Sequence, residues 1–239
     1  MLRALLVATA LTGACTASHR SAAPDQTPSP TPSPTIAPAP QVVGLAVDAA
    51  VAALRPTCSS RVARIEHADR PVGTVTAQAQ PASDVCEVEL TVSSGPDVAA
   101  PPCSALTIGF GHPDAATGHE FMVVTFLNRG PRCTVRGWPD VTARDRGAGL
   151  PTVTARRTQQ GFLGGSDLVV DRYVLGTGDR VWALVETGDN PVGDATSCTT
   201  LTDVTVRVGS SSAQAPYALS HCNGMDIDPF VPGTGGELA

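Results

Sequence analysis

The spacing of the cysteines constrains the fold of this chain more than any other feature. Seven cysteines occur in 239 residues, and six of them are spread between residues 58 and 222 without a C-x-x-C pair, which argues against a zinc site or a thioredoxin-like motif. An even number of cysteines in an exported chain indicates disulfides, because the compartment is oxidising. Six cysteines allow 15 pairings, and local organisation favours Cys58–Cys86, Cys103–Cys133 and Cys198–Cys222. Each bridge would close a loop of about 25 to 30 residues, which stabilises a fold by roughly 3 to 4 kcal/mol.

The N-terminus indicates export. Met1–Arg3 is a short basic start, and Ala4–Leu11 is an apolar run that falls well short of the roughly 20 residues of a membrane-spanning helix but is typical of a secretory signal. The next residues, Thr12-Gly13-Ala14-Cys15, resemble the bacterial lipobox, in which small residues precede a cysteine that accepts a diacylglycerol. The resemblance implies that residues 1–14 are a signal peptide and that Cys15 is lipidated, which would anchor the protein on the outer face of the cell membrane. The alternative is an ordinary signal peptide, with Cys15 incidental.

Residues 15–39 are expected to form a disordered tether. Pro, Ser, Thr and Ala dominate this stretch, and such a segment buries too little to offset the entropy of ordering it. Extended at about 3.1 Å per residue, it would reach at most about 75 Å. It would then lift a folded part off a membrane, while the alternative is a filler without a role.

Charge excludes several classes of function. The formal net charge is −6, and all sixteen basic residues are arginines. A nucleic-acid binder needs clustered positive charge, so we expect no nucleic-acid partner. Without lysine, the chain has no catalytic lysine, no Schiff base and no P-loop.

The segment 40–97 reads as a small α+β domain. Val47, Ala50, Val51 and Leu54 are spaced for one apolar helix face, and Pro56 ends the pattern. Three strand-like pieces follow, around residues 62–65, 73–77 and 88–92, the last with strict alternation. A domain of one helix and a three-stranded sheet of this size is only marginally stable without a covalent cross-link. The Cys58–Cys86 disulfide would supply one.

This segment resembles a PASTA domain, the repeat attached to penicillin-binding proteins and bacterial Ser/Thr kinases. The resemblance rests on residues 42–45, on residues 71–75 followed by Gln78 and Gln80-Pro81, and on residues 90–96. Members of that family are associated with binding peptidoglycan fragments or β-lactams. The resemblance therefore implies a peptidoglycan ligand or another partner in the cell envelope.

The segment 100–232 is predicted to be all β. Short strand-like pieces alternate with turn signals, at residues 106–110, 121–127, 141–143, 168–170, 180–185 and 201–208. No long helical pattern occurs. Seven or so strands over this length favour an immunoglobulin-like β-sandwich, followed by a disordered tail at residues 233–239.

The same segment is similar to an uncharacterised β-sandwich domain of actinobacterial lipoproteins and secreted proteins. The similarity rests on Cys103, on the stretch from Asn128 to Pro139 with its Cys-x-x-x-Gly-Trp-Pro element, and on the Leu175–Asp179 turn. That family has no established activity. It implies a fold and a location outside the cytoplasm, not a reaction.

Catalytic motifs are not found. A G-x-S-x-G elbow, a helical zinc-protease motif and a dinucleotide fingerprint are all lacking, so we expect no cofactor and no metal.

Arg61 and Arg64 are candidate ligand-binding residues, because guanidinium groups match the carboxylates of cell-wall stem peptides; ordinary surface charge is the alternative. Trp138 is a third candidate, which can stack on a sugar or simply plug the core.

These patterns predict a lipid-anchored, non-enzymatic binding protein of the cell surface that recognises peptidoglycan or a cell-envelope protein. A structural spacer or adhesion module without a small ligand is the main alternative. A cell-wall hydrolase would need a reactive cleft, for which the sequence gives no sign.

Overall fold

A computed structural model describes residues 37–81, 85–116, 118–146, 151–159, 172–191 and 198–235. The predicted signal peptide, Cys15 and nearly all of the predicted tether lie outside these residues, as does the strand expected at 168–170. Among the described residues, no helix combines the length and the apolar character needed to cross a bilayer.

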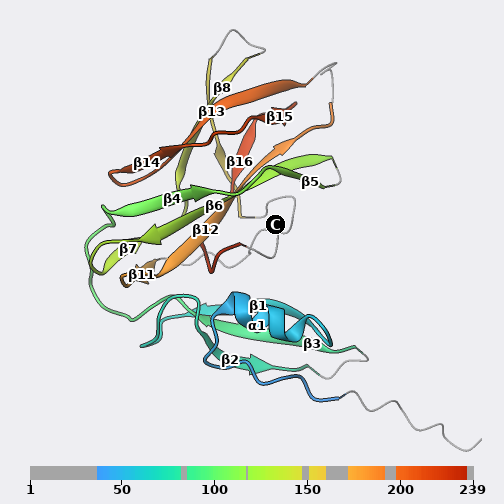
Figure 1. Cartoon of the computed structure of the whole chain (residues 1–239), viewed down its shortest axis with the longest axis vertical. Coiled ribbons are helices and arrows are strands. Elements are labelled where there is room, and N and C mark those ends of the chain that lie inside the picture. Colours follow the sequence, from blue (N-terminus) through green and yellow to red (C-terminus); the bar gives the residue numbers. More distant parts are fainter. Residues whose placement is uncertain are drawn as a thin grey trace, which may run out of the picture. The chain divides into compact units, whose positions relative to one another are not determined.

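The helix-bearing module (residues 37–98) consists of one helix and a three-stranded sheet, as predicted. Its elements are α1 (Val47–Leu54), β1 (Ser59–Glu66), β2 (Val75–Ala79) and β3 (Glu87–Ser93). The sheet has the order β1-β3-β2, with β3 parallel to β1 and antiparallel to β2 (Figure 1). The helix ends at Leu54, two residues before Pro56, which has no backbone N–H and cannot continue the helical hydrogen bonds.

The core of this module lies between α1 and one face of the sheet. Val47, Ala50 and Leu54 of the helix are buried against alternate residues of the strands. On β3 those residues are Val88, Leu90 and Val92, all fully buried. The alternation predicted for β3 is therefore real, and it turns one face of the sheet to the helix.

The chain that leads into α1 runs beside the edge strand β2. Gln78 of β2 binds this segment twice: its Oε1 accepts from the Val42 backbone N–H at 2.7 Å, and its Nε2 donates to the Pro40 carbonyl at 3.0 Å. Gln80 Oε1 accepts from the Ala39 N–H at 3.0 Å. The two amide side chains thus take the place of a neighbouring strand and fix the point at which the N-terminal segment joins the module.

The β-rich region (residues 99–235) contains two larger sheets. The first has the order β10-β16-β12-β6-β4, with β5 also paired to β6 and β17 to β12; the second has the order β14-β13-β8-β9, with β15 paired to β13. A two-stranded sheet joins β7 to β11. The strands are β4 (Leu106–Phe110), β5 (Asp114–Ala116), β6 (His119–Asn128), β7 (Cys133–Val135), β8 (Asp140–Asp145), β9 (Thr152–Thr154), β10 (Arg156–Arg157), β11 (Tyr173–Leu175), β12 (Arg180–Gly188), β13 (Thr199–Val208), β14 (Ser211–Gln214), β15 (Leu219–His221), β16 (Met225–Ile227) and β17 (Val231–Pro232).

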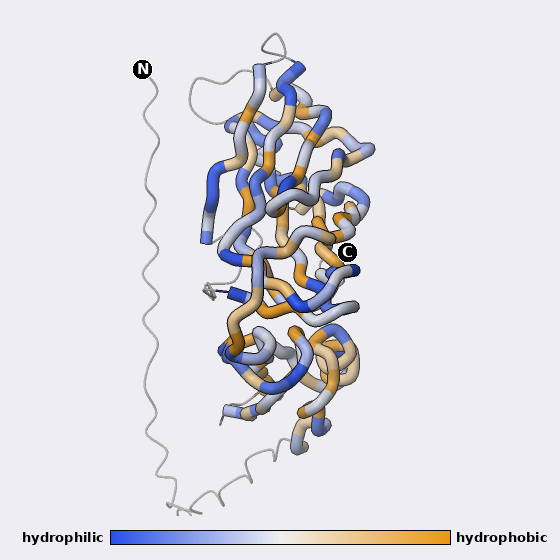
Figure 2. Tube along the Cα trace, turned by 90° about the vertical axis from the view of Figure 1, so that its left-hand side faces the viewer, coloured by the Kyte–Doolittle hydropathy of each residue, from blue (hydrophilic) through white to orange (hydrophobic). Residues whose placement is uncertain are grey.

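Both larger sheets contribute to one hydrophobic core. Strands β6 and β12 supply Phe126 and Val185 from the first sheet, and β13 supplies Leu201 and Val206 from the second. Along the tube in Figure 2, short hydrophobic stretches are interrupted repeatedly by hydrophilic ones. The described chain is therefore β-rich, as predicted, and it contains additional strands of only two to four residues that the sequence patterns did not indicate.

Three disulfides cross-link the described residues. Cys58 is bonded to Cys86, Cys103 to Cys133 and Cys198 to Cys222, with Cα–Cα distances of 4.7, 4.8 and 4.2 Å. These are the pairings that local organisation predicted. They indicate an oxidising, extracytoplasmic location.

The helix-bearing module and the β-rich region belong to one compact unit. Three backbone N–H groups donate across their junction: that of Val174 to the Ser94 carbonyl (2.9 Å), that of Val72 to Asp179 Oδ2 (3.3 Å) and that of Thr234 to Asp48 Oδ1 (3.2 Å). Thr234 belongs to the stretch expected as a tail. Residues 233–235 of that stretch are described, and residues 236–239 are not.

Candidate functional site

The helix-bearing module carries a hollow of about 720 Å³, here called the first hollow. It is lined by Val43, Gly44, Ala68, Asp69, Arg70, Val75 and Thr76. These residues come from the loop before α1, the turn after β1 and the start of β2. The lining therefore combines small apolar groups with one guanidinium and one carboxylate.

The loop before α1 gives this hollow an exposed apolar rim. Val43, which lines the hollow, is 52% exposed, and Leu45, two residues further along the same loop, is 41% exposed. The cause is local: Gly44 has a φ of +92°, and the loop is held to β2 by a bond from its N–H to the Val75 carbonyl at 2.8 Å. Glycine adopts this backbone geometry at little cost, so the turn can stay tight while its neighbours point outward.

Arg70 provides the positive charge of the hollow. Its backbone is fixed, because its N–H donates to the Ala68 carbonyl at 2.7 Å and its carbonyl accepts from Ser93 Oγ at 3.1 Å. Its side chain is exposed, and it forms no ion pair within the described part of the chain. A guanidinium on a rigid loop without a carboxylate partner is available to an anionic ligand.

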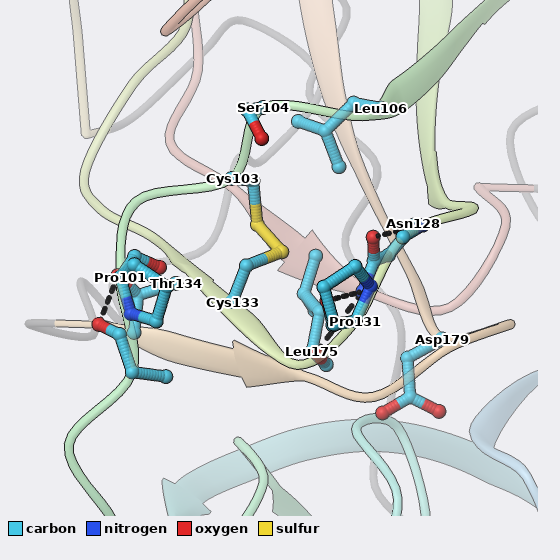
Figure 3. The surroundings of a disulfide bond; sticks show 12 residues. Pro101, Cys103, Ser104, Leu106, Asn128, Pro131, Cys133, Thr134, Leu175 and Asp179 are labelled. Atoms are coloured by element: carbon cyan, nitrogen blue, oxygen red, sulfur yellow. Dashed lines mark hydrogen bonds between the residues drawn. A yellow bond between two sulfur atoms is a disulfide. The ribbon is translucent and has the colours of Figure 1, made fainter.

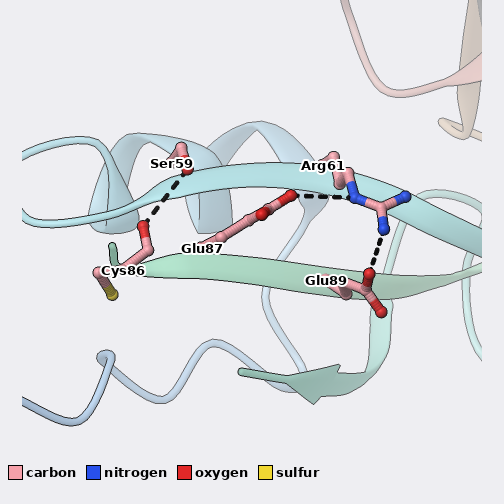
Figure 4. Close-up of polar contacts among 5 residues, drawn as sticks. All are labelled: Ser59, Arg61, Cys86, Glu87 and Glu89. Carbon is pink, nitrogen blue, oxygen red and sulfur yellow. Dashed lines mark hydrogen bonds and ion pairs between the residues drawn. The ribbon is translucent and has the colours of Figure 1, made fainter. Parts of the chain in front are cut away.

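Arg61, a candidate from the sequence, is engaged by neighbouring carboxylates instead. Its Nε lies 3.1 Å from Glu87 Oε1, and its terminal nitrogen also pairs with Glu89 (Figure 4). The parallel register explains this, because Arg61 lies opposite Glu89 on β3. Arg64, the second candidate, is exposed on β1 beyond the bulge and does not line the first hollow.

Trp138, the third candidate, lies at the margin of the large core. It is half-buried and packs against that core, and its Nε1 donates to the Thr158 carbonyl at 2.7 Å. Its polar atom is thus satisfied within the protein, as expected for the plugging role. It does not line the first hollow.

A buried hydroxyl–imidazole–carboxylate network lies beside the Cys198–Cys222 disulfide. Thr199 Oγ1 is 2.7 Å from His221 Nε2 and 2.8 Å from Asp145 Oδ1, and His221 Nε2 is 3.2 Å from Asp145 Oδ2. The Gly224 N–H donates to His221 Nδ1 at 3.1 Å, which places the proton of a neutral imidazole on Nε2. No imidazole lone pair then faces the Thr199 hydroxyl, so this network holds strands together and does not activate a nucleophile.

An acidic cluster lies where β12 meets β16. Glu186 and Asp228 are buried, Asp226 is half-buried opposite Glu186, and Arg156 binds Asp226 through two nitrogens at 2.8 and 3.1 Å. Burial raises the pKa of Asp228 to about 7, and the negative charges of Glu186 and Asp226 add to the shift. The bond to Asp226 raises the pKa of Arg156. Among the described residues no group of His, Cys, Asp or Glu has the arrangement of a metal site.

The comparisons with known proteins concern the β-rich region. A family model described as a domain of unknown function (DUF4232) matches residues 102–230. This range falls within the segment 100–232 that the sequence patterns set apart. No curated protein and no solved structure shows a significant match to the chain.

Proposed function

Because the chain belongs to the DUF4232 family, which is defined by a domain of unknown function, its role has to be inferred from its surface, and we propose that it is an exported, lipid-anchored, non-enzymatic binding protein. The helix-bearing module is the part that binds. Its ligand is a short peptide of the cell wall that carries a carboxylate and small apolar side chains.

One observation carries this proposal: the first hollow joins an exposed apolar rim to an arginine without a partner. Val43 and Leu45 expose apolar surface that folding would otherwise bury, and such surface commonly marks a contact site. Arg70, on the turn after β1, lines the same hollow. A ligand that covers the rim can place a carboxylate against this guanidinium.

The chemistry of cell-wall stem peptides fits this lining. Their alanine methyl groups match the small apolar contacts of Val43 and Ala68, and their carboxylates match the planar guanidinium of an arginine. The hollow is open to solvent, so the affinity is expected to be weak, with a Kd of roughly 10 µM to 1 mM. Attachment to the membrane would offset this weakness by confining the module near its ligand.

The proposal extends to the fold and to the two ends of the chain. We assign the helix-bearing module to the PASTA type and the β-rich region to the immunoglobulin-like sandwiches. The order of one helix and three strands supports the first assignment, and the core shared by two sheets supports the second. A peptidoglycan strand is the favoured partner, and a cell-envelope protein is the second.

The first prediction concerns Arg70. NMR titration of the full ectodomain with purified muropeptides should shift the signals of residues 43–45 and 68–70, and Arg70→Gln should weaken binding about tenfold by removing the charge-assisted bonds. Arg64→Gln is the matched control, since Arg64 is also exposed but lies outside the hollow. Absence of any shift with millimolar muropeptide would contradict the proposal and favour the alternative of a structural spacer without a small ligand.

The second prediction concerns the anchor. If Cys15 carries a diacylglycerol, the wild-type protein partitions into the detergent phase, because two acyl chains give stable membrane attachment. Cys15→Ala should remain in the aqueous phase or stay uncleaved. An unmodified N-terminus before the tether, measured by mass spectrometry of the native protein, would contradict the anchor.

A further inference from the structure

A second hollow of about 290 Å³ adjoins the first hollow. Asp69 and Arg70 line both. The other walls include Pro71 and Pro96 of the helix-bearing module, and Arg132 and Asp179 of the β-rich region. A ligand that extends past Arg70 therefore enters a space that the guanidinium of Arg132 also lines.

Arg132 stands on a rigid loop. The preceding residue, Pro131, accepts at its carbonyl from Asn128 Nδ2 at 3.0 Å, and the following residue, Cys133, is bonded to Cys103 (Figure 3). Asn128 is fully buried, and its amide also donates to the carbonyls of Leu175 and Gly176, at 3.2 and 3.1 Å. One asparagine thus fixes the loop of Arg132 to the turn that forms the next wall of the hollow.

The two walls of the second hollow are tied to each other. Asp179 Oδ2 accepts from the Gly176 N–H of its own turn at 2.9 Å and from the Val72 N–H of the opposite wall at 3.3 Å. Val72 follows Arg70 by two residues. The backbone positions of Arg70 and Arg132 are therefore set before any ligand arrives, which lowers the entropic cost of binding.

The charges of this hollow favour separate carboxylates. Arg132, like Arg70, is exposed and forms no ion pair among the described residues. Asp179 is occupied by backbone N–H groups, but Asp69 lines both hollows and adds a negative charge near them. That charge disfavours a compact, multiply charged anion such as phosphate more than two carboxylates held apart, each on its own guanidinium.

We propose that Arg132 binds a second carboxylate of a peptide whose first carboxylate binds Arg70, so that the ligand is an extended diacid lying in both hollows. This rests on the proposed function and adds to it. It gives the β-rich region a part in recognition, and it predicts that the family domain and the helix-bearing module bind one ligand together.

The test uses the full ectodomain and two peptides that differ by one carboxylate, N-acetyl-Ala-Glu-Ala and N-acetyl-Ala-Gln-Ala. NMR titration should find that the wild type binds the Glu peptide about tenfold more tightly. Arg132→Gln should remove this preference and leave the affinity for the Gln peptide unchanged. Arg70→Gln should weaken both peptides.

Arg136→Gln is the matched control, because Arg136 is exposed close to Arg132 in the sequence but lines neither hollow. A preference for the Glu peptide that survives in Arg132→Gln would overturn the inference, as would inorganic phosphate that competes as well as the Glu peptide. If muropeptides bind and the wild type shows no preference for the diacid, the inference fails while the proposed function stands. If neither peptide nor any muropeptide binds, both fail.

Discussion

Asp228 is the residue whose chemistry the fold changes most. The residue is 2% exposed, and its Oδ1 has no hydrogen-bond partner among the described residues. Burial beside Glu186 and Asp226 raises its pKa from the ordinary 3.8 to about 7. Between these two values the folded protein binds more protons than the unfolded chain, so the free energy of unfolding falls as the pH rises from about 4 to 7.

Asp228→Asn should therefore stabilise the protein at high pH and not at low pH. At pH 8 we expect Tm to rise by several degrees, since about 1 kcal/mol shifts Tm by about 2–4 °C in a domain of this size; at pH 4 we expect little change. Asp114→Asn is the control, because Asp114 is exposed and forms no ion pair among the described residues. Equal gains for Asp228→Asn at both pH values, measured by thermal unfolding, would show that the carboxyl titrates normally.

Which residues could be predicted from the sequence depended on how local their partners are. The three disulfides join cysteines 24 to 30 residues apart, and pairing each cysteine within its own segment was enough to find them. Arg61 and Arg70 look alike in the sequence, because what separates them is the register of β1 against β3. That register brings Glu87 and Glu89 to Arg61, whereas Arg70 lies on the turn after β1, beyond the paired strands.

At the scale of elements, long and regular pieces were predictable and short ones were not. The helix α1, the alternating β3 and the long strands β6, β12 and β13 lie where the periodicity placed them. Strands of two or three residues, such as β7, β10 and β17, contain too few residues to show a period. Their pairing depends on neighbours distant in the sequence, as when β7 pairs with β11.

The turns that build the two hollows belong to this second class. Glycine and proline marked them as turns in the sequence, but their partners lie far along the chain: Asn128 contacts Leu175, and Val72 contacts Asp179. Sequence reasoning could have selected Arg70 and Arg132 only from their places next to prolines, which fix the backbone. The candidate site was therefore missed while most of the fold around it was anticipated.

At the scale of the whole molecule, the sequence patterns suggested two separate domains, and the contacts suggest one cooperative unit. Ile65 and Val72 of the helix-bearing module pack against the large core. Gly95 allows the closest approach: its φ is +91°, and a Cβ added there would collide with the Val174 carbonyl. Only glycine fits this backbone position beside β11.

We therefore expect the disulfide-intact ectodomain to unfold in a single calorimetric transition, because contacts across the junction couple the two parts. Gly95→Ala should separate the helix-bearing module as a second transition at lower temperature, since the added methyl group pushes Ser94 away from Val174. Gly224→Ala is the matched control: its φ of +95° carries the same backbone strain, but nothing lies within 4 Å of the added Cβ. If Gly224→Ala splits the transition equally, strain alone is responsible, and if the wild type already shows two transitions, the parts fold independently. A single transition that only Gly95→Ala divides would show that the contacts at the junction couple the unfolding of the two parts.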